Sequence, residues 1–85
     1  MNDIILYTQP GCGPCIGLKR KLTTDGHIFR EVNIREDAGA QARVAELGYT
    51  GTPVVEYTDA AGERQSFHGF RSDILLELKP APAVA

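Results

Sequence analysis

The sequence has little of what marks several specialised classes of small protein. It contains two cysteines in 85 residues, too few for a disulfide-rich secreted scaffold. Acidic residues outnumber Lys and Arg by 11 to 9, so no basic field is present to hold nucleic acid or an anionic membrane. We therefore expect neither nucleic acid nor a membrane among its partners. Apolar residues make up 42%, which is too much for a disordered chain and ordinary for a folded one.

Long apolar runs are also missing. The N-terminal segment is acidic rather than basic, and its apolar run, Ile4 to Tyr7, is shorter than a signal peptide requires. No run approaches the roughly 18 apolar residues of a membrane span. We therefore expect a protein of the reducing cytoplasm, where a cysteine pair is more often catalytic or metal-binding than structural.

The pattern of apolar, glycine and proline residues predicts the order strand, helix, strand, helix, strand, strand, helix. The strands are expected at 4–8, 29–34, 54–58 and 65–68, and the helices at 14–25, 38–47 and 73–78. This order implies an α/β fold, in which helices cover a sheet with parallel and antiparallel parts. We expect a single domain over 1–79. Because Pro80 and Pro82 prevent further helix, we expect a flexible tail over 80–85.

The two cysteines form the motif Cys12-Gly13-Pro14-Cys15, between a predicted strand and a predicted helix. A spacing of three places both sulfurs on one side of the first helical turn, and the helix N-terminus stabilises a thiolate on Cys12. Gly13 leaves room for a substrate backbone, and Pro14 stiffens the turn. The motif predicts a reversible Cys12–Cys15 disulfide, in which Cys12 attacks a substrate and the more buried Cys15 resolves the mixed disulfide.

Two other interpretations of the cysteines remain open. The first is that the cysteines bind a metal. Zinc would be bound with His27 and His68 in a Cys₂His₂ set, and zinc or an iron–sulfur cluster could also be bound by cysteines shared across a dimer. The histidines are far apart in sequence, whereas zinc-finger histidines are separated by three to five residues, and proline beside Cys15 crowds a cluster. An inert buried pair is the second, although Gly13 and Pro14 make a poor core. We expect no bound metal or cofactor.

A second motif is Thr52-Pro53, directly before the apolar pair Val54-Val55. Proline is tolerated at the first residue of a strand, so an ordinary trans proline fits. A cis bond would instead present the Thr52 backbone to a peptide bound beside Cys12. The residues alone favour neither form.

Together these motifs resemble a known family. The segment 7–15 is similar to the strand and active site of glutaredoxins, and segments 46–55 and 68–73 resemble the NrdH-redoxins, electron donors to class Ib ribonucleotide reductase. The resemblance covers residues 4–78. It implies a minimal glutaredoxin-like thioredoxin fold, βαβαββα with a four-stranded mixed sheet, a cis Pro53 and dithiol-disulfide oxidoreductase activity.

The resemblance also suggests residues that contact a substrate or partner: Tyr7, Gln9, Gly69, Phe70 and Arg71. For Tyr7 and Phe70 core packing is favoured over such contact, and for Arg71 a surface ion pair is an equal alternative. The basic run at 19–21 is either a solvated helix face or a dock for an acidic partner. Nothing in the sequence demands more than a monomer.

This chain departs from the glutaredoxin pattern at positions that bind glutathione, which bears on the choice of reductant. Glutaredoxins have a lysine for a glutathione carboxylate where Gln9 stands, and two acids for its ammonium group where Arg71 and Ser72 stand. Each lost charge-assisted contact is worth about 1.5–3 kcal/mol. We therefore expect recharging by thioredoxin reductase, with NADPH used indirectly, and keep a glutathione-dependent glutaredoxin as the alternative.

The active site departs as well. Gly13-Pro14 is the thioredoxin pair, whereas NrdH-redoxins more often have a pair of the Val-Gln type. Thioredoxins have a buried aspartate six positions before the first cysteine, where this chain has Leu6. With no buried acid expected nearby, proton transfer involving Cys15 is expected to use water or the partner protein.

Overall fold

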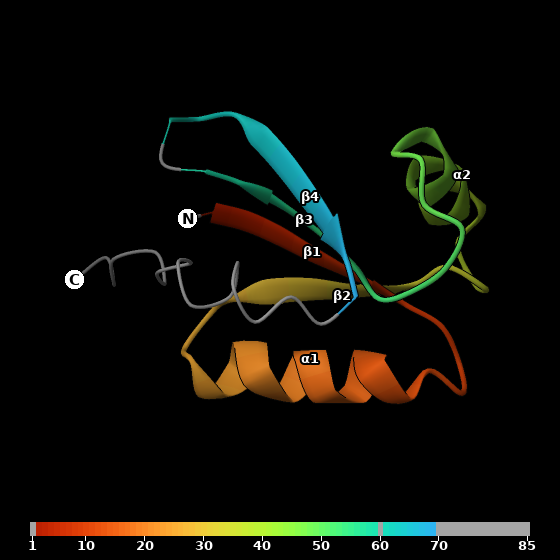
Figure 1. The fold of residues 1–85 in the computed structure, drawn as a ribbon, viewed down its shortest axis with the longest axis horizontal. Helices are drawn as coiled ribbons and strands as arrows, with labels where there is room; N and C mark the ends of the chain where they lie inside the picture. Colours follow the sequence, from red (N-terminus) through yellow and green to blue (C-terminus); the bar gives the residue numbers. More distant parts are fainter. Residues whose placement is uncertain (1, 60, 70–85) are drawn as a thin grey trace.

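A computed structural model describes residues 2–59 and 61–69. Its elements are β1 (Asn2–Thr8), α1 (Gly13–Thr24), β2 (Phe29–Asn33), α2 (Ala38–Glu46), β3 (Val54–Thr58) and β4 (Arg64–His68) (Figure 1). The helix expected at 73–78, the tail at 80–85, Phe70 and Arg71 lie outside the described residues. None of the described helices is long and apolar enough to cross a membrane.

The four strands form one mixed sheet in the order β2-β1-β3-β4. β1 and β2 are parallel, while β3 is antiparallel to both β1 and β4. Helix α1 connects the parallel pair and covers one face of the sheet, and α2 lies on the other side (Figure 1). This is the thioredoxin-like arrangement that the sequence predicted.

Alternation along β1 sends neighbouring side chains to opposite faces and creates two apolar clusters. Leu6 packs toward α1, whereas Tyr7 packs toward α2. The buried members of the α1-face cluster are Ile4, Leu6, Leu18, Leu22, Val55 and Phe67. Those of the α2-face cluster are Tyr7, Ile34, Ala40, Val44 and Val54. Burying each such aliphatic side chain contributes about 1.5–3 kcal/mol, so the clusters fix both helices against the sheet.

The helix boundaries follow from capping. Helix α2 begins after Asp37, whose Oδ1 accepts a hydrogen bond from the Ala40 N–H at 3.0 Å. It ends at Glu46, one residue before the predicted end, because Leu47 is the C-cap. Helix α1 ends at Thr24, and Gly26 follows with a φ of 80°, the left-handed conformation that glycine favours.

Candidate active site

The two cysteines form a disulfide at the beginning of α1, with their Cα atoms 5.3 Å apart. Cys12 is the N-cap, and its Sγ accepts a hydrogen bond from the Cys15 N–H at 3.2 Å. Cys15 is 4% exposed, whereas Cys12 is half-buried. As predicted, Cys12 is the more accessible of the two cysteines and lies where free helical N–H groups stabilise negative charge.

Glycine shapes the turn that leads into the motif. Gly11 has a φ of 77°, a region that residues with a Cβ rarely adopt. The Cys12 N–H donates to the Gln9 carbonyl at 3.3 Å and closes this turn. The chain therefore leaves β1 and enters α1 with the first sulfur at the tip of the connection.

A cavity of about 370 Å³ opens beside the disulfide. Its lining comes from the end of β1, the following turn, the start of α1 and the end of β2: Thr8, Gln9, Pro10, Gly11, Cys12, Cys15, Ile16, Lys19, Glu31 and Asn33. Of the predicted contact residues, Gln9 lines this cavity.

Glu31 is a lining residue that the sequence analysis missed. Its Oε1 lies 2.8 Å from the Lys19 Nζ, and its Oε2 accepts a 3.4 Å hydrogen bond from the Thr8 hydroxyl. Lys19 lies one helical turn after Cys15 and Glu31 lies two residues after Phe29, which packs on the α1-face cluster. These two spacings were the signal in the sequence that could have placed a carboxylate on the side of the sheet that holds the second cysteine.

The Thr52–Pro53 peptide bond is cis, as the family resemblance implied. Tyr7 and Val54 are register partners, so Pro53 lies at the end of the sheet from which the connection to Cys12 departs. The Gly69 N–H donates to the Pro53 carbonyl at 2.8 Å and joins this loop to the end of β4. The structure thus brings Gly69 and the cis proline together at the active-site end of the sheet.

Tyr7 lies apart from the cavity. It is 4% exposed on the α2 face, and its hydroxyl donates to Glu56 Oε1 at 2.9 Å. Burial, together with this hydrogen bond, raises the pKa of Tyr7 to about 12. The geometry therefore favours packing rather than partner contact for this aromatic residue.

Comparison with known proteins decides the family. The Glutaredoxin family model matches residues 4–59. The glutaredoxin-like protein NrdH of Escherichia coli K12 is 33% identical over 82 residues, which cover 96% of this chain and 95% of the relative. That of Lactococcus lactis subsp. cremoris MG1363 is 31% identical over 75 residues, covering 88% and 97%. This chain belongs to the NrdH-redoxin branch of the glutaredoxin family.

A solved structure agrees with the sequence comparison. The NrdH-redoxin of Escherichia coli, described as a glutaredoxin-like protein with a thioredoxin-like activity profile, superposes with a TM-score of 0.81. The two are 31% identical, and the match covers 95% of this chain and all of the other. The redoxin is thus a thiol-disulfide oxidoreductase with a thioredoxin-like fold and the thioredoxin dipeptide Gly13-Pro14 between its cysteines.

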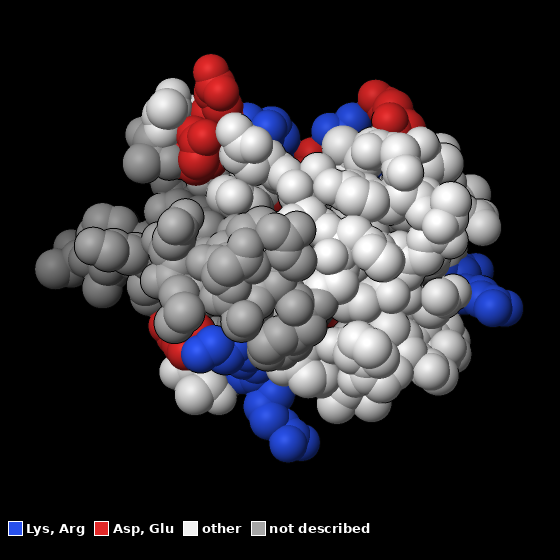
Figure 2. All heavy atoms as spheres, viewed as in Figure 1, with Lys and Arg blue, Asp and Glu red and all other residues white. Residues whose placement is uncertain are grey.

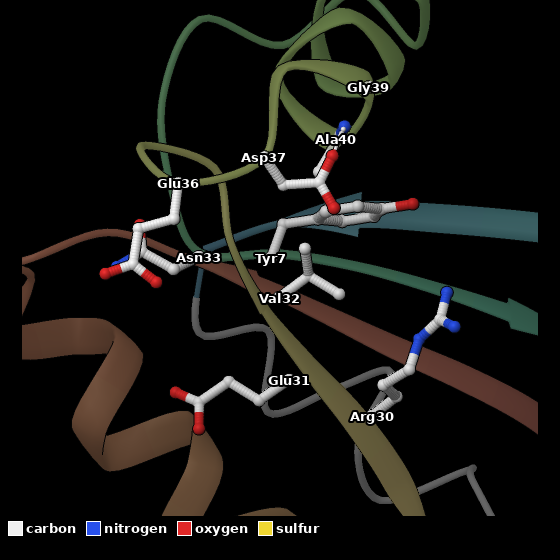
Figure 3. Close-up of a pocket in the computed structure, with 9 residues that line it drawn as sticks. All are labelled: Tyr7, Arg30, Glu31, Val32, Asn33, Glu36, Asp37, Gly39 and Ala40. Atoms are coloured by element: carbon white, nitrogen blue, oxygen red, sulfur yellow. Dashed lines mark hydrogen bonds between the residues drawn. The ribbon is translucent and has the colours of Figure 1, made fainter.

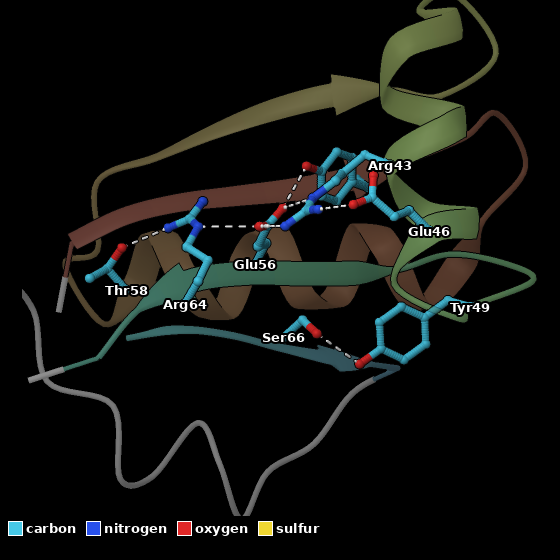
Figure 4. Close-up of polar contacts among 8 residues, drawn as sticks. Arg43, Glu46, Tyr49, Glu56, Thr58, Arg64 and Ser66 are labelled. Carbon is cyan, nitrogen blue, oxygen red and sulfur yellow. Dashed lines mark hydrogen bonds and ion pairs between the residues drawn. The ribbon is translucent and has the colours of Figure 1, made fainter. Parts of the chain in front are cut away.

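The α2 face of the redoxin contains a buried carboxylate. Glu56 is 4% exposed and joins four elements (Figure 4). Besides the Tyr7 hydroxyl, it contacts Arg43 Nη2 at 2.7 Å and Arg64 Nε at 3.2 Å. The hydrogen bond with Arg43 lowers the pKa of Glu56 against the opposing effect of burial. This cluster ties β1, β3, β4 and α2 together and takes no part in lining the disulfide cavity.

A second hollow of about 600 Å³ lies on the other side of β2, next to the start of α2. Its lining residues are Tyr7, Arg30, Glu31, Val32, Asn33, Glu36, Asp37, Gly39 and Ala40. Figure 3 shows Glu31 directed toward α1, away from Tyr7 and Val32. Its carboxylate therefore belongs to the disulfide side of the strand.

The histidines of the zinc interpretation do not gather at the cysteines. Across residues 2–59 and 61–69, no group of three or more His, Cys, Asp or Glu residues is placed to hold a metal ion. His27 is buried, and burial lowers its pKa. His68 instead stacks on Tyr49, with ring centroids 5.8 Å apart.

Proposed function

We propose that this redoxin transfers electrons from thioredoxin reductase, and ultimately NADPH, to the disulfide of a ribonucleotide reductase in the cytoplasm. The observation that carries the proposal is the Cys12–Cys15 disulfide at the N-terminus of α1, in which Cys12 is half-buried and Cys15 is buried. The NrdH-redoxin membership supports ribonucleotide reductase as the acceptor.

The proposed reaction has two exchange steps. In the first, the Cys12 thiolate attacks one sulfur of the partner disulfide, and the other partner sulfur leaves as a thiolate. In the second, Cys15 loses its proton and attacks Cys12, so the intramolecular disulfide forms and the second partner thiolate leaves. Two electrons pass to the partner, whose thiolates take protons from water. The reductase returns two electrons and restores the dithiol.

The surface around Cys12 suits a protein partner. Figure 2 shows mostly uncharged atoms over the start of α1 and the loop leading to β3. Gly13 and Pro14 are exposed there, and Ile16 leaves 65% of its surface exposed one position after Cys15. An uncharged, partly apolar surface beside a reactive disulfide suits contact with another protein, because charged residues are depleted at the centre of protein interfaces. Thr52, Pro53, Gly69, Phe70 and Arg71 complete our proposed contact set, with Gln9 from the cavity.

The charges of the cavity favour thioredoxin reductase over glutathione. Among the described lining residues Lys19 has the only positive charge, and its ammonium group already pairs with Glu31 at 2.8 Å. A glutathione carboxylate would have to displace Glu31 from Lys19, because Gln9 offers no charge. The thioredoxin-like activity profile of the Escherichia coli relative supports the same reductant.

Coupled reduction of insulin disulfides with NADPH tests the proposal. Wild-type protein is assayed with thioredoxin reductase and, in parallel, with glutathione plus glutathione reductase, and Cys12→Ser serves as the inactive control. Turnover with thioredoxin reductase alone is expected, followed by support of a class Ib ribonucleotide reductase as its sole dithiol donor. Turnover only with glutathione would overturn the choice of reductant, and failure to support ribonucleotide reductase would overturn the choice of acceptor.

A further inference from the structure

The second exchange step requires an acceptor for a proton. Cys15 is buried and lies within the first turn of α1, whereas Cys12 occupies the N-cap. Only the thiolate is nucleophilic, so Cys15 must lose its proton as it attacks Cys12. A positioned base that takes this proton accelerates the step.

The disulfide cavity contains one carboxylate among its described lining residues, that of Glu31. The other charged lining residue is Lys19 of α1; Thr8 of β1, Asn33 of β2 and Gln9 of the connecting turn are uncharged. Leu6, which replaces the buried aspartate of thioredoxins, is fully buried in the α1-face cluster and offers no acceptor. Glu31 is therefore the candidate base that this cavity offers to Cys15.

The position of Glu31 is fixed by two contacts. Lys19 Nζ holds one carboxylate oxygen at 2.8 Å, and the Thr8 hydroxyl contacts the other at 3.4 Å. Lys19 follows Cys15 by four residues on α1, so the ion pair draws the carboxylate toward the helix face that carries the second sulfur. The Glu31 side chain is 37% exposed, which lets it exchange a proton with solvent.

We propose that Glu31 accepts the proton of the Cys15 thiol, through water in the cavity, as Cys15 attacks the mixed disulfide on Cys12. The cavity of about 370 Å³ has room for the water that this transfer needs. The Cys15–Cys12 bond forms, the bond from Cys12 to the partner sulfur breaks, and the partner thiolate leaves with the electron pair. The proton passes from Cys15 to Glu31 and then to solvent. Lys19 acts as the positioning residue for the carboxylate.

This inference rests on the proposed function only for the roles of the two cysteines, and its test needs no reductase. Reduced protein is mixed with excess 5,5′-dithiobis(2-nitrobenzoate) in a stopped-flow instrument. The first nitrothiobenzoate is released when Cys12 attacks, and the second is released when Cys15 resolves the mixed disulfide. The two steps are therefore measured separately in one reaction.

Glu31→Gln is compared with wild type and with Glu63→Gln, which makes the same change in the exposed turn before β4. We expect Glu31→Gln to leave the first phase unchanged and to slow the second at least about tenfold at pH 7. The deficit should shrink as the pH rises, because hydroxide then removes the Cys15 proton. Glu31→Asp, which keeps a carboxylate, should recover part of the rate, and Glu63→Gln should behave as wild type.

Several outcomes would overturn the proposal. An unchanged second phase in Glu31→Gln would show that Glu31 does not take the proton. A pH-independent deficit, or an equal deficit in Glu31→Asp, would show that the residue acts only through structure, and thermal unfolding of each variant identifies loss of fold. A wild-type protein without a second phase would contradict the roles of the cysteines themselves, so failure of the proposed function is recognised separately.

Discussion

The two faces of the sheet each hold a carboxylate, and the two groups differ in almost every respect. Glu56, on the α2 face, is 4% exposed and is held by a tyrosine and two arginines. Glu31, on the α1 face, has a side chain that is 37% exposed, is held by one lysine and one weak hydrogen bond, and borders the disulfide. A buried charge must be compensated by several partners, and the contacts that compensate Glu56 stabilise the fold. A half-exposed charge needs fewer partners and keeps its access to protons.

Replacing Glu56 gives the largest effect on stability that we expect from either carboxylate. Glu56→Gln removes the charge from a buried site and takes from Arg43 and Arg64 the carboxylate that they share, although Arg43 keeps its ion pair with Glu46. Because these arginine side chains are 35% and 34% exposed and can turn to water, we expect a loss of about 3 kcal/mol, the lower end for a broken buried pair. Chemical denaturation measures this loss, and the rate of disulfide exchange should not change.

The pH dependence checks the cause of that loss. Glu56 has a pKa below its ordinary value in the fold, so its contribution is present above about pH 4.3 and is lost as the pH falls through the lowered folded pKa. The difference in stability between wild type and Glu56→Gln should therefore shrink in acid. A difference that stays constant down to pH 2 would show that packing, not charge, causes the loss.

Tyr7→Phe is expected to have a smaller effect on the same face. It removes one hydrogen bond to the Glu56 carboxylate and keeps both arginine contacts, so we expect a loss of about 1.5 kcal/mol. Thermal unfolding and insulin reduction are measured together. If Tyr7→Phe lowered the exchange rate without lowering stability, the assignment of Tyr7 to the structural face would be wrong.

We expect the smallest effect on stability from His27, a buried residue whose burial is not compensated by hydrogen bonds within the described part of the chain. It is 6% exposed, and neither ring nitrogen has a hydrogen-bond partner among the residues that the structure describes. Burial lowers its pKa, so the unfolded chain binds the proton more readily than the folded one. Stability should therefore decline as the pH falls below about 6.5, and His27→Phe should remove this part of the decline. Parallel curves of stability against pH for wild type and His27→Phe would contradict this account of His27.

The sequence predicted the fold well because its elements are bounded by residues with strong local preferences. Pro14 lies in the first turn of α1, α2 begins at residue 38 as predicted, and the run 54–58 forms β3. Among the elements that the structure describes, the errors lie at the ends, as in β1, which begins two residues early at Asn2 and pairs with Thr58 of β3. Such pairing depends on a strand distant in sequence, which local patterns do not report.

The site was predicted less completely, for a similar reason. Cys12 and Cys15 form one local motif, so their placement followed from sequence alone. Glu31 and Lys19 are twelve positions apart on different elements, and their ion pair exists only because β2 lies beside β1 under α1. Alternation along β2 and helical spacing from Cys15 show which side of its own element each residue occupies. They place the two residues together only once the packing of helix on sheet is known.

The central claim is that disulfide exchange takes place on the α1 face and begins with attack by Cys12. Trapping the mixed disulfide tests this claim most directly. Cys15→Ser is incubated with an oxidised protein substrate, and the products are mapped by mass spectrometry, with Cys12→Ser as the matched control. We predict a covalent adduct through Cys12 in the Cys15→Ser protein and no adduct in Cys12→Ser. An adduct on Cys15 in the control, or none on Cys12 in Cys15→Ser, would contradict the account.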